Sequence, residues 1–194
     1  MAYKQGSTTE LPPEVSTHFS GVRDAADDLK TIQPLVPSGK LLDYGCSWGY
    51  CTRQFIEAGY DAEGFEISEP RAQYGRGTLG LRITSDITDF EDSSFDVIYT
   101  AHVLEHIPTP KATLNEFRRL LKPGGMLFLY VPNCGGKRAR DQGVHWGPMM
   151  GEKHVLSLTA EFFLRNLPAH GFDVSQPTDP DGDELRVIAR RGTE

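Results

Sequence analysis

The chain has 194 residues, of which 38% are hydrophobic and 24% are charged, a balance typical of a globular domain and unlike that of a disordered chain. Acidic residues outnumber basic ones by 27 to 20, for a formal net charge of −7, which argues against binding of DNA or RNA. No apolar stretch approaches the roughly 20 residues that cross a bilayer, the start lacks an apolar signal segment, and the three cysteines form no C-x-x-C pair. These features predict a cytoplasmic protein with no membrane partner.

Short apolar segments alternate with helical patterns along the chain. An N-terminal extension with a helix between Val15 and Leu35 is expected over residues 1–37, and one domain over residues 38–194. Strands are expected at 40–44, 61–67, 81–84, 95–100, 126–131, 172–175 and 185–189, and helices at 50–58, 69–74, 111–121 and 159–167. This alternation predicts an α/β fold with a parallel sheet between helices, and an antiparallel pair at the end, where no helix separates the last two strands.

The turn after the first strand has a pattern typical of a cofactor site. Gly45 and Gly49 lie between strand and helix, where glycine lets the backbone approach a ligand and the helix N-terminus favours a polar or anionic group. Glu66 ends the next strand, 66 − 45 = 21 residues after Gly45, the spacing at which an acid binds ribose hydroxyls in Rossmann-type sites. NAD(P) is disfavoured because Ser47 and Tyr50 stand where its glycine fingerprint needs glycine.

The same turn also matches the G-x-S-x-G nucleophile elbow of hydrolases, with Ser47 as the nucleophile. The elbow would follow the first strand of the sheet, and only about 40 residues precede it, which leaves little chain for the earlier parts of a hydrolase fold. A serine hydrolase that uses Ser47 therefore stays as an alternative.

Five segments in this order resemble class I S-adenosylmethionine-dependent methyltransferases. The segment DYGCSWG is similar to the family's D-x-G-x-G-x-G, with Ser47 in place of the middle glycine. Glu66 stands where the family's ribose-binding acid stands, and Asp86 resembles the acid that meets the adenine amine. The segments FDVIYTAHVLEHIPTP and LKPGGMLFLYVPN resemble the fourth strand with its E-H loop, and the fifth strand.

This resemblance implies a Rossmann-like, doubly wound sheet of seven strands in the order 3-2-1-4-5-7-6, with an antiparallel last strand. It implies S-adenosyl-L-methionine as the cofactor. The residues that would bind the cofactor are Asp43, Gly45, Ser47, Gly49, Glu66, Asp86, Ile87 and Thr100.

The loop after the fourth strand contains His102 and His106 in an H-x-x-E-H pattern, which also occurs in zinc proteases. Zinc would need a third ligand and a longer helix than Pro108 and Pro110 allow, so no metal is expected. The resemblance places this loop beside the methyl donor and the acceptor, which makes His106, and second His102, candidates to take a proton from the acceptor. The alternative is that Glu105 and His106 only fix the loop, because positioning alone contributes much of the rate of methyl transfer.

The segment from Asn133 to Lys153 is rich in glycine and is expected to form an irregular, mobile lid over the acceptor. Its basic residues, Lys137, Arg138 and Arg140, favour an anionic acceptor. Trp146, His154 and Arg138 are the candidate substrate residues.

The sequence therefore predicts methyl transfer from S-adenosyl-L-methionine to an O or N atom of a small, possibly anionic or sugar-like acceptor. Besides the hydrolase, the alternative is a non-catalytic module that binds S-adenosylmethionine without turnover. The sequence does not predict an oligomeric state.

Overall fold

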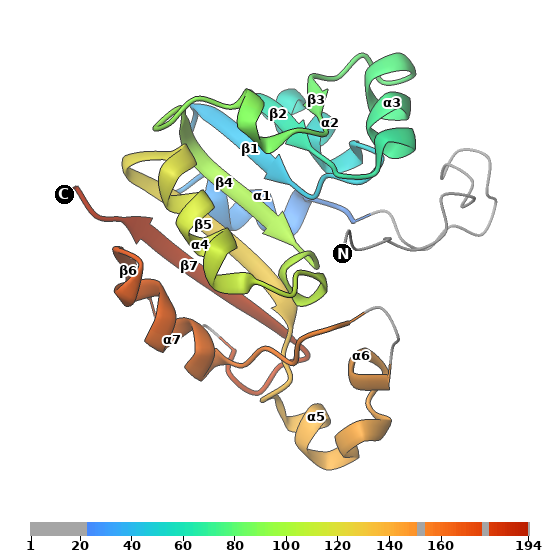
Figure 1. The fold of residues 1–194 in the computed structure, drawn as a ribbon, viewed down its shortest axis with the longest axis vertical. Helices are drawn as coiled ribbons and strands as arrows, with labels where there is room; N and C mark the ends of the chain where they lie inside the picture. The colour runs from blue at the N-terminus through green and yellow to red at the C-terminus, as the bar shows by residue number, and fades with distance from the viewer. Residues whose placement is uncertain (1–22, 151–153, 176–178, 194) are drawn as a thin grey trace. The chain divides into compact units, whose positions relative to one another are not determined.

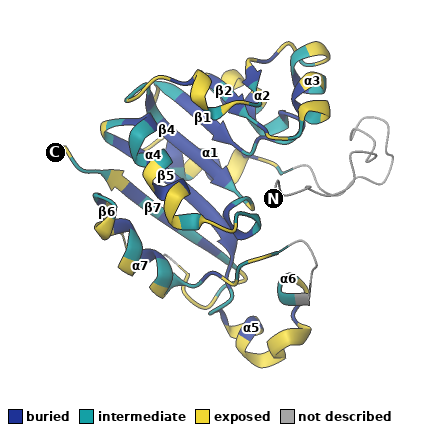
Figure 2. Cartoon of the chain, viewed as in Figure 1, coloured by how far each residue is buried: buried dark blue, intermediate teal, exposed yellow. Residues whose placement is uncertain are grey.

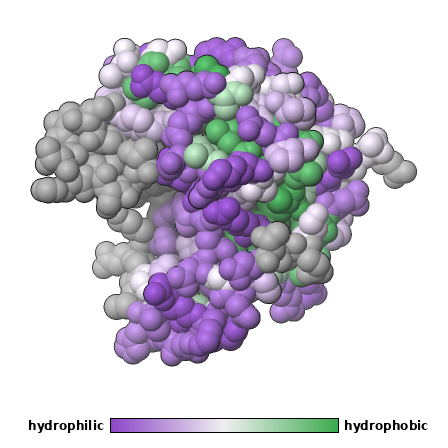
Figure 3. Space-filling model, turned by 180° about the vertical axis from the view of Figure 1, so that it is seen from behind, coloured by the Kyte–Doolittle hydropathy of each residue, from purple (hydrophilic) through white to green (hydrophobic). Residues whose placement is uncertain are grey.

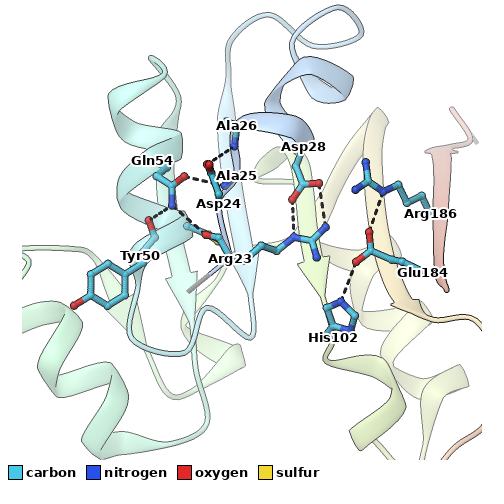
Figure 4. Close-up of polar contacts among 11 residues, drawn as sticks. Arg23, Asp24, Ala25, Ala26, Asp28, Tyr50, Gln54, His102, Glu184 and Arg186 are labelled. Atoms are coloured by element: carbon cyan, nitrogen blue, oxygen red, sulfur yellow. Dashed lines mark hydrogen bonds and ion pairs between the residues drawn. The ribbon is translucent and has the colours of Figure 1, made fainter. Parts of the chain in front are cut away.

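A computed structural model describes residues 23–150, 154–175 and 179–193 (Figure 1). The chain divides into two compact units, residues 1–89 and 90–194. The helix expected between Val15 and Leu35 lies partly outside the described residues, and its described part is α1 (Ala26–Ile32). Within the first unit, the buried Asp28 of α1 forms an ion pair with Arg23, and Gln54 accepts a hydrogen bond from the Ala25 amide (Figure 4).

The strands confirm the predicted α/β fold. The first unit contains β1 (Lys40–Tyr44), β2 (Asp61–Phe65) and β3 (Ile83–Thr84), and the second contains β4 (Phe95–Ala101), β5 (Leu121–Pro132), β6 (Phe172–Val174) and β7 (Glu184–Arg191). Their order is β3-β2-β1-β4-β5-β7-β6, as expected. The pairs β1–β2, β2–β3 and β4–β5 are parallel, whereas β7 is antiparallel to β5 and β6. The antiparallel strand is therefore one place in from the edge, and β6 is the edge strand.

The first unit packs α2 (Tyr50–Glu57) and α3 (Glu69–Gly77) on its three strands. Gly49 precedes α2 with a φ of 91°, a left-handed conformation that favours glycine. A Cβ at this position would lie 2.5 Å from Leu81 Cδ1 and 3.0 Å from Ile83 Cδ1. The space beside Gly49 is therefore filled by core side chains, which gives this glycine a packing role besides the close approach to a ligand that the sequence predicts.

The second unit is built on β5, in which every residue from Gly125 to Pro132 is buried (Figure 2). Buried apolar runs of this kind are typical of strands covered on both faces. The sequence predicts this strand only from residue 126, but β5 pairs with β4 at Leu121 and again from Met126, so the intervening residues form a bulge inside the strand. The helix α7 (Ala160–Ala169) lies against β6 and β7.

The helix α4 (Pro110–Leu120) begins at a proline and buries Leu114, Phe117 and Leu120 on one face, as the periodicity predicts. Hydrophilic residues make up most of the molecular surface shown in Figure 3. In the part of the chain that the structure describes, no helix combines the length and apolar character needed to cross a membrane.

Replacement of Gly49 by alanine tests the packing role of this glycine. Left-handed backbone strain costs about 1–2 kcal/mol, and steric overlap in a packed core adds about 1–3 kcal/mol. Gly59 is the matched control, because its φ is 96° and a Cβ there meets nothing within 4 Å. We expect Gly49→Ala to lower the free energy of unfolding in urea by more than Gly59→Ala does; equal losses would show that Leu81 and Ile83 move aside without cost.

Candidate active site

The turn after β1 is fastened to the end of β2 by backbone hydrogen bonds. The amides of Gly45 and Cys46 both donate to the carbonyl of Phe65, over 2.8 and 3.0 Å. Ser47 follows with a φ of 52°, a left-handed conformation that costs a residue with a side chain about 1–2 kcal/mol. This strain explains why glycine suits the position in the family pattern.

Glu66 stands at the centre of this turn. Its carboxylate accepts the amide of Ser47 at 2.9 Å through Oε2 and the amide of Ser68 at 2.7 Å through Oε1. The side chain is buried, and burial raises the pKa of Glu66, partly offset by the two amides and the charge of Arg71. Each carboxylate oxygen has two lone-pair positions, so each keeps one with which to accept a hydrogen bond from a ligand hydroxyl.

Asp43 is buried at the end of β1, where its Oδ2 accepts a 2.7 Å hydrogen bond from the Thr52 hydroxyl of α2. Burial raises the pKa of Asp43 to about 7, against the opposing effect of Thr52 and with a smaller contribution from the charge of Glu66. The structure thus gives Asp43 a partner inside the protein, one that joins β1 to α2.

Side chains of α3 cover this turn, and the sequence analysis missed them. Tyr74 packs edge-on against the buried Trp48, with ring centroids 5.3 Å apart, and the Arg71 guanidinium lies 5.6 Å from the Trp48 ring centroid. Arg71 also donates to Ser47 Oγ at 3.5 Å. The group bonded to the Ser47 hydroxyl is thus a guanidinium, which cannot act as the general base that a serine nucleophile requires.

Asp86 follows β3 and begins the 3₁₀ turn η1 (Ile87–Asp89). It is exposed, and its Oδ1 accepts the amide of Thr88 at 2.9 Å and the Thr88 hydroxyl at 2.7 Å, which lowers the pKa of Asp86. These contacts fix the carboxylate through one oxygen. The other oxygen is available to a ligand donor, and the half-buried Ile87 lies beside it in sequence.

In the second unit, Thr100 is buried near the end of β4, and its hydroxyl has no hydrogen-bond partner among the described residues. His102 follows with a φ of 57°, a second left-handed residue at a strand end. Its amide donates to the Tyr130 carbonyl at 2.8 Å. Backbone strain of this kind persists only where the surroundings hold it, and it is frequent at functional sites.

The His102 ring lies between two carboxylates. Its Nε2 is 2.9 Å from Glu184 Oε2, and Glu184 also accepts from Arg186 (Figure 4). Its Nδ1 is 3.5 Å from Glu105 Oε1. Burial lowers the pKa of His102, but the two carboxylates together outweigh it and raise the pKa to about 9. His102 is therefore charged at neutral pH and has no lone pair with which to take a proton.

Glu105, His106 and His154 form a cluster in the second unit. Glu105 and His106 belong to the 3₁₀ turn η2 (Leu104–His106), and the His106 and His154 ring centroids are 4.8 Å apart. The amides of Val155 and Leu156 both donate to the Glu105 carbonyl, over 3.0 and 3.1 Å. The structure thus joins His106, predicted on the catalytic loop, to His154, predicted as a substrate residue.

The segment expected to be irregular is largely helical. It contains α5 (Lys137–Gln142), the 3₁₀ turn η3 (Gly143–His145) and α6 (Gly147–Met150), while residues 151–153 lie outside the described part. Trp146 is only 4% exposed, so its ring packs inside this unit.

The basic residues of this segment are exposed, and each pairs with an aspartate. Arg138 bonds to Asp183 at 2.7 Å, and the other two pairs are Lys137–Asp141 and Arg140–Asp181. The asparagine that precedes them, Asn133, is buried and donates to the carbonyls of Pro180 and Gly182. The three cations are thus neutralised locally, which gives no support to an anion site at Arg138.

The fold, with its strand order β3-β2-β1-β4-β5-β7-β6, is that of class I S-adenosylmethionine-dependent methyltransferases. A family model described as a methyltransferase domain matches residues 18–176, and the chain belongs to this family. S-adenosyl-L-methionine is accordingly the cofactor.

The comparisons with individual proteins agree. The chain is 32% identical over 163 residues to a ubiquinone biosynthesis O-methyltransferase of Methylococcus capsulatus, a match that covers 79% of this chain and 62% of the relative. It spans between 52% and 62% of the length of such relatives. Among solved structures it is similar in fold to an S-adenosylmethionine-dependent methyltransferase from Mesorhizobium loti, with a TM-score of 0.67, 18% identity, and coverage of 86% of this chain and 97% of that one. A Haemonchus contortus phosphoethanolamine N-methyltransferase in complex with S-adenosyl-L-methionine gives a TM-score of 0.66 at 16% identity, covering 86% of this chain and 52% of that one.

Replacement of Glu66 by glutamine is expected to weaken binding of S-adenosylhomocysteine, the demethylated product of the cofactor. Loss of a charged hydrogen bond costs about 1.5–3 kcal/mol, or roughly 10- to 150-fold in the dissociation constant measured by calorimetry. Glu57→Gln, at the exposed end of α2, is the control and should bind as the parent does. Unchanged affinity in folded Glu66→Gln would limit Glu66 to bracing the turn.

Replacement of Asp43 by asparagine tests the burial of this carboxyl. Because the pKa of Asp43 is raised to about 7 in the folded protein, its ionisation opposes folding, and the parent loses stability as pH rises from about 4 to 7. Asp43→Asn lacks this ionisation, so it should gain on the parent by up to about 1.4 kcal/mol per pH unit in this window. Urea unfolding at pH 5 and pH 8, with the exposed Asp173→Asn as control, checks the prediction; a difference independent of pH would contradict it.

Proposed function

We propose that this chain transfers the methyl group of S-adenosyl-L-methionine to a hydroxyl oxygen of a small acceptor. The observation that carries the cofactor half is the buried Glu66 carboxylate, held by the Ser47 and Ser68 amides with acceptor positions to spare. When bound, the cofactor supplies a methyl group on a sulfonium sulfur, and an acceptor oxygen that attacks the methyl carbon in line displaces this sulfur.

The residues of the first unit fit this cofactor by their chemistry. Glu66 would accept hydrogen bonds from ribose hydroxyls, Asp86 would accept one from the adenine amine, and Ile87 would contribute apolar surface for the adenine ring. Gly45, Ser47 and Gly49 shape the turn next to the methionine part, and Asp43 braces this turn through Thr52. In the second unit, the buried hydroxyl of Thr100 lacks a partner within the described residues and suits a ligand donor or acceptor.

On the acceptor side, His106 is the group that we place at the acceptor hydroxyl. It is half-buried and next to the buried Glu105 carboxylate, whereas His102 is committed to Glu184 and Glu105. His154 and Trp146 belong to the same unit, and His154 contacts His106 directly. We therefore assign His106 to catalysis, His154 to the acceptor side, and His102 to positioning of the loop.

The names of the relatives support one class of acceptor. Proteins named as ubiquinone biosynthesis O-methyltransferases match this chain at 30–32% identity, so an oxygen atom is favoured over nitrogen and hydroxylated ubiquinone precursors are the first acceptors to test. An anionic or sugar-like acceptor remains the second candidate, although the cations at 137, 138 and 140 are paired with aspartates.

Replacement of His106 by alanine is expected to lower turnover at least 10²-fold, because a positioned group that assists proton removal contributes about 10²–10⁴-fold. Turnover is measured as S-adenosylhomocysteine formed with a hydroxylated ubiquinone precursor. Binding of S-adenosylhomocysteine should change less than twofold, and His170→Ala, at the end of α7, is the control. Parental turnover in His106→Ala would leave positioning of the reactants as the whole mechanism. If the parent itself forms no product, the ubiquinone precursor is rejected as the acceptor.

A further inference from the structure

The cluster of Glu105, His106 and His154 has the composition of a metal site. The carboxylate and one nitrogen of each imidazole lie within 4.8 Å of one another, and His106 Nε2 is 3.9 Å from Glu105 Oε1. Zinc bound tetrahedrally at 2.0–2.2 Å would hold its ligand atoms about 3.4 Å apart. Side-chain rotations that move these atoms by about 1 Å would therefore complete the site.

The Glu105 carboxylate is the first observation that points to a ligand. The residue is 1% exposed, and neither of its carboxylate oxygens accepts a hydrogen bond from any residue that the structure describes. A buried carboxylate in this condition is costly unless a cation compensates it. The charged His102 ring lies 3.5 Å from Oε1 and compensates part of this charge, but it is also bound to Glu184 and leaves Oε2 without a hydrogen-bond partner among the described residues.

The orientation of His154 is the second observation. Its Nδ1 lies 2.7 Å from the carbonyl oxygen of Pro148. A carbonyl can only accept, so Nδ1 carries a hydrogen, and Nε2 is the nitrogen whose lone pair would bind a ligand. Histidines that bind metals almost always donate their other ring N–H to a carbonyl or carboxylate in this way.

We propose that Glu105, His106 and His154 bind a divalent transition-metal ion of the zinc type. Two imidazoles with one carboxylate suit zinc and its neighbours better than magnesium, which prefers oxygen ligands. Three protein ligands also match catalytic zinc sites, which keep one position open for water or substrate. The sequence analysis expected no metal because H-x-x-E-H lacked a third ligand; His154 supplies it, and His102 is not part of the site.

The open position gives the ion a role that rests on the proposed function: with the ion bound, His106 assists proton removal through the ion and does not take the proton itself. An acceptor hydroxyl bound there is acidified, as water is when zinc lowers its pKa from 15.7 to about 7. The proton leaves to solvent, and an electron pair of the oxygen forms the bond to the methyl carbon. The carbon–sulfur bond breaks with its electron pair going to sulfur, which becomes a neutral thioether.

Calorimetric titration of the chelator-treated chain with Zn²⁺ tests the site without any acceptor. We expect one ion per chain, at least tenfold weaker binding in His154→Ala and in the nearly isosteric Glu105→Gln, and no more than a twofold change in the control His145→Ala, an exposed histidine of η3. Co²⁺ loading provides a second readout, because its visible absorption reports a low coordination number that both ligand variants should lose. Circular dichroism verifies that each variant is folded.

Absence of Zn²⁺ binding, or parental binding by both folded ligand variants, overturns the site. A separate measurement distinguishes the site from its role. Methyl transfer that is unchanged after removal of the ion overturns acidification of the acceptor while the binding site stands. Zinc binding that needs His154 in a protein that methylates no acceptor supports the site and counts against the proposed function alone.

Discussion

The buried carboxylate of Glu66 is the constraint on which the cofactor half of the site depends. Burial of a carboxylate is unfavourable unless hydrogen bonds satisfy it, and two backbone amides do so here, one from the turn after β1 and one from the start of α3. The same two bonds hold Ser47 in its left-handed conformation and set the entry to α3. One side chain thus joins two strand ends and keeps acceptor positions for ligand hydroxyls.

Two strained residues mark the two loops that carry the predicted chemistry. Ser47 and His102 both have a positive φ. Ser47 lies in the turn after β1, and His102 directly follows β4. The amide of Ser47 is held by Glu66, and the amide of His102 by the Tyr130 carbonyl. Backbone strain of about 1–3 kcal/mol is tolerated where such contacts over-determine the conformation. A left-handed residue turns the chain away from the direction of the preceding strand. The amides and side chains of Ser47 and His102 therefore point where a regular strand would not place them.

Local patterns sufficed to predict most of the fold. The apolar runs of β1, β4 and β5 and the helical face of α4 are encoded within a few residues, so their positions were predicted to within one or two residues except at the bulge in β5. Pairings between distant residues were not predictable in this way. Leu81 fills the space beside Gly49, and Arg138 forms an ion pair with Asp183. No periodicity or spacing in one sequence specifies such contacts, and the Asp183 contact removes the support that the pattern gave to an anion site at Arg138.

In the loop after β4, contacts between distant residues change which histidines are expected to lie near Glu105. In the sequence, His102 and His106 flank Glu105 and suggest one chelating pair. In the structure, His102 Nε2 contacts Glu184 at 2.9 Å while its Nδ1 stays 3.5 Å from Glu105, and the Glu105 carbonyl accepts hydrogen bonds from the amides of residues 155 and 156. His154, 154 − 106 = 48 residues after His106, is thereby brought next to the His106 ring, with ring centroids 4.8 Å apart. The hydrogen bonds from the Val155 and Leu156 amides to the Glu105 carbonyl thus bring His154 to this loop, and no spacing along the chain predicts them.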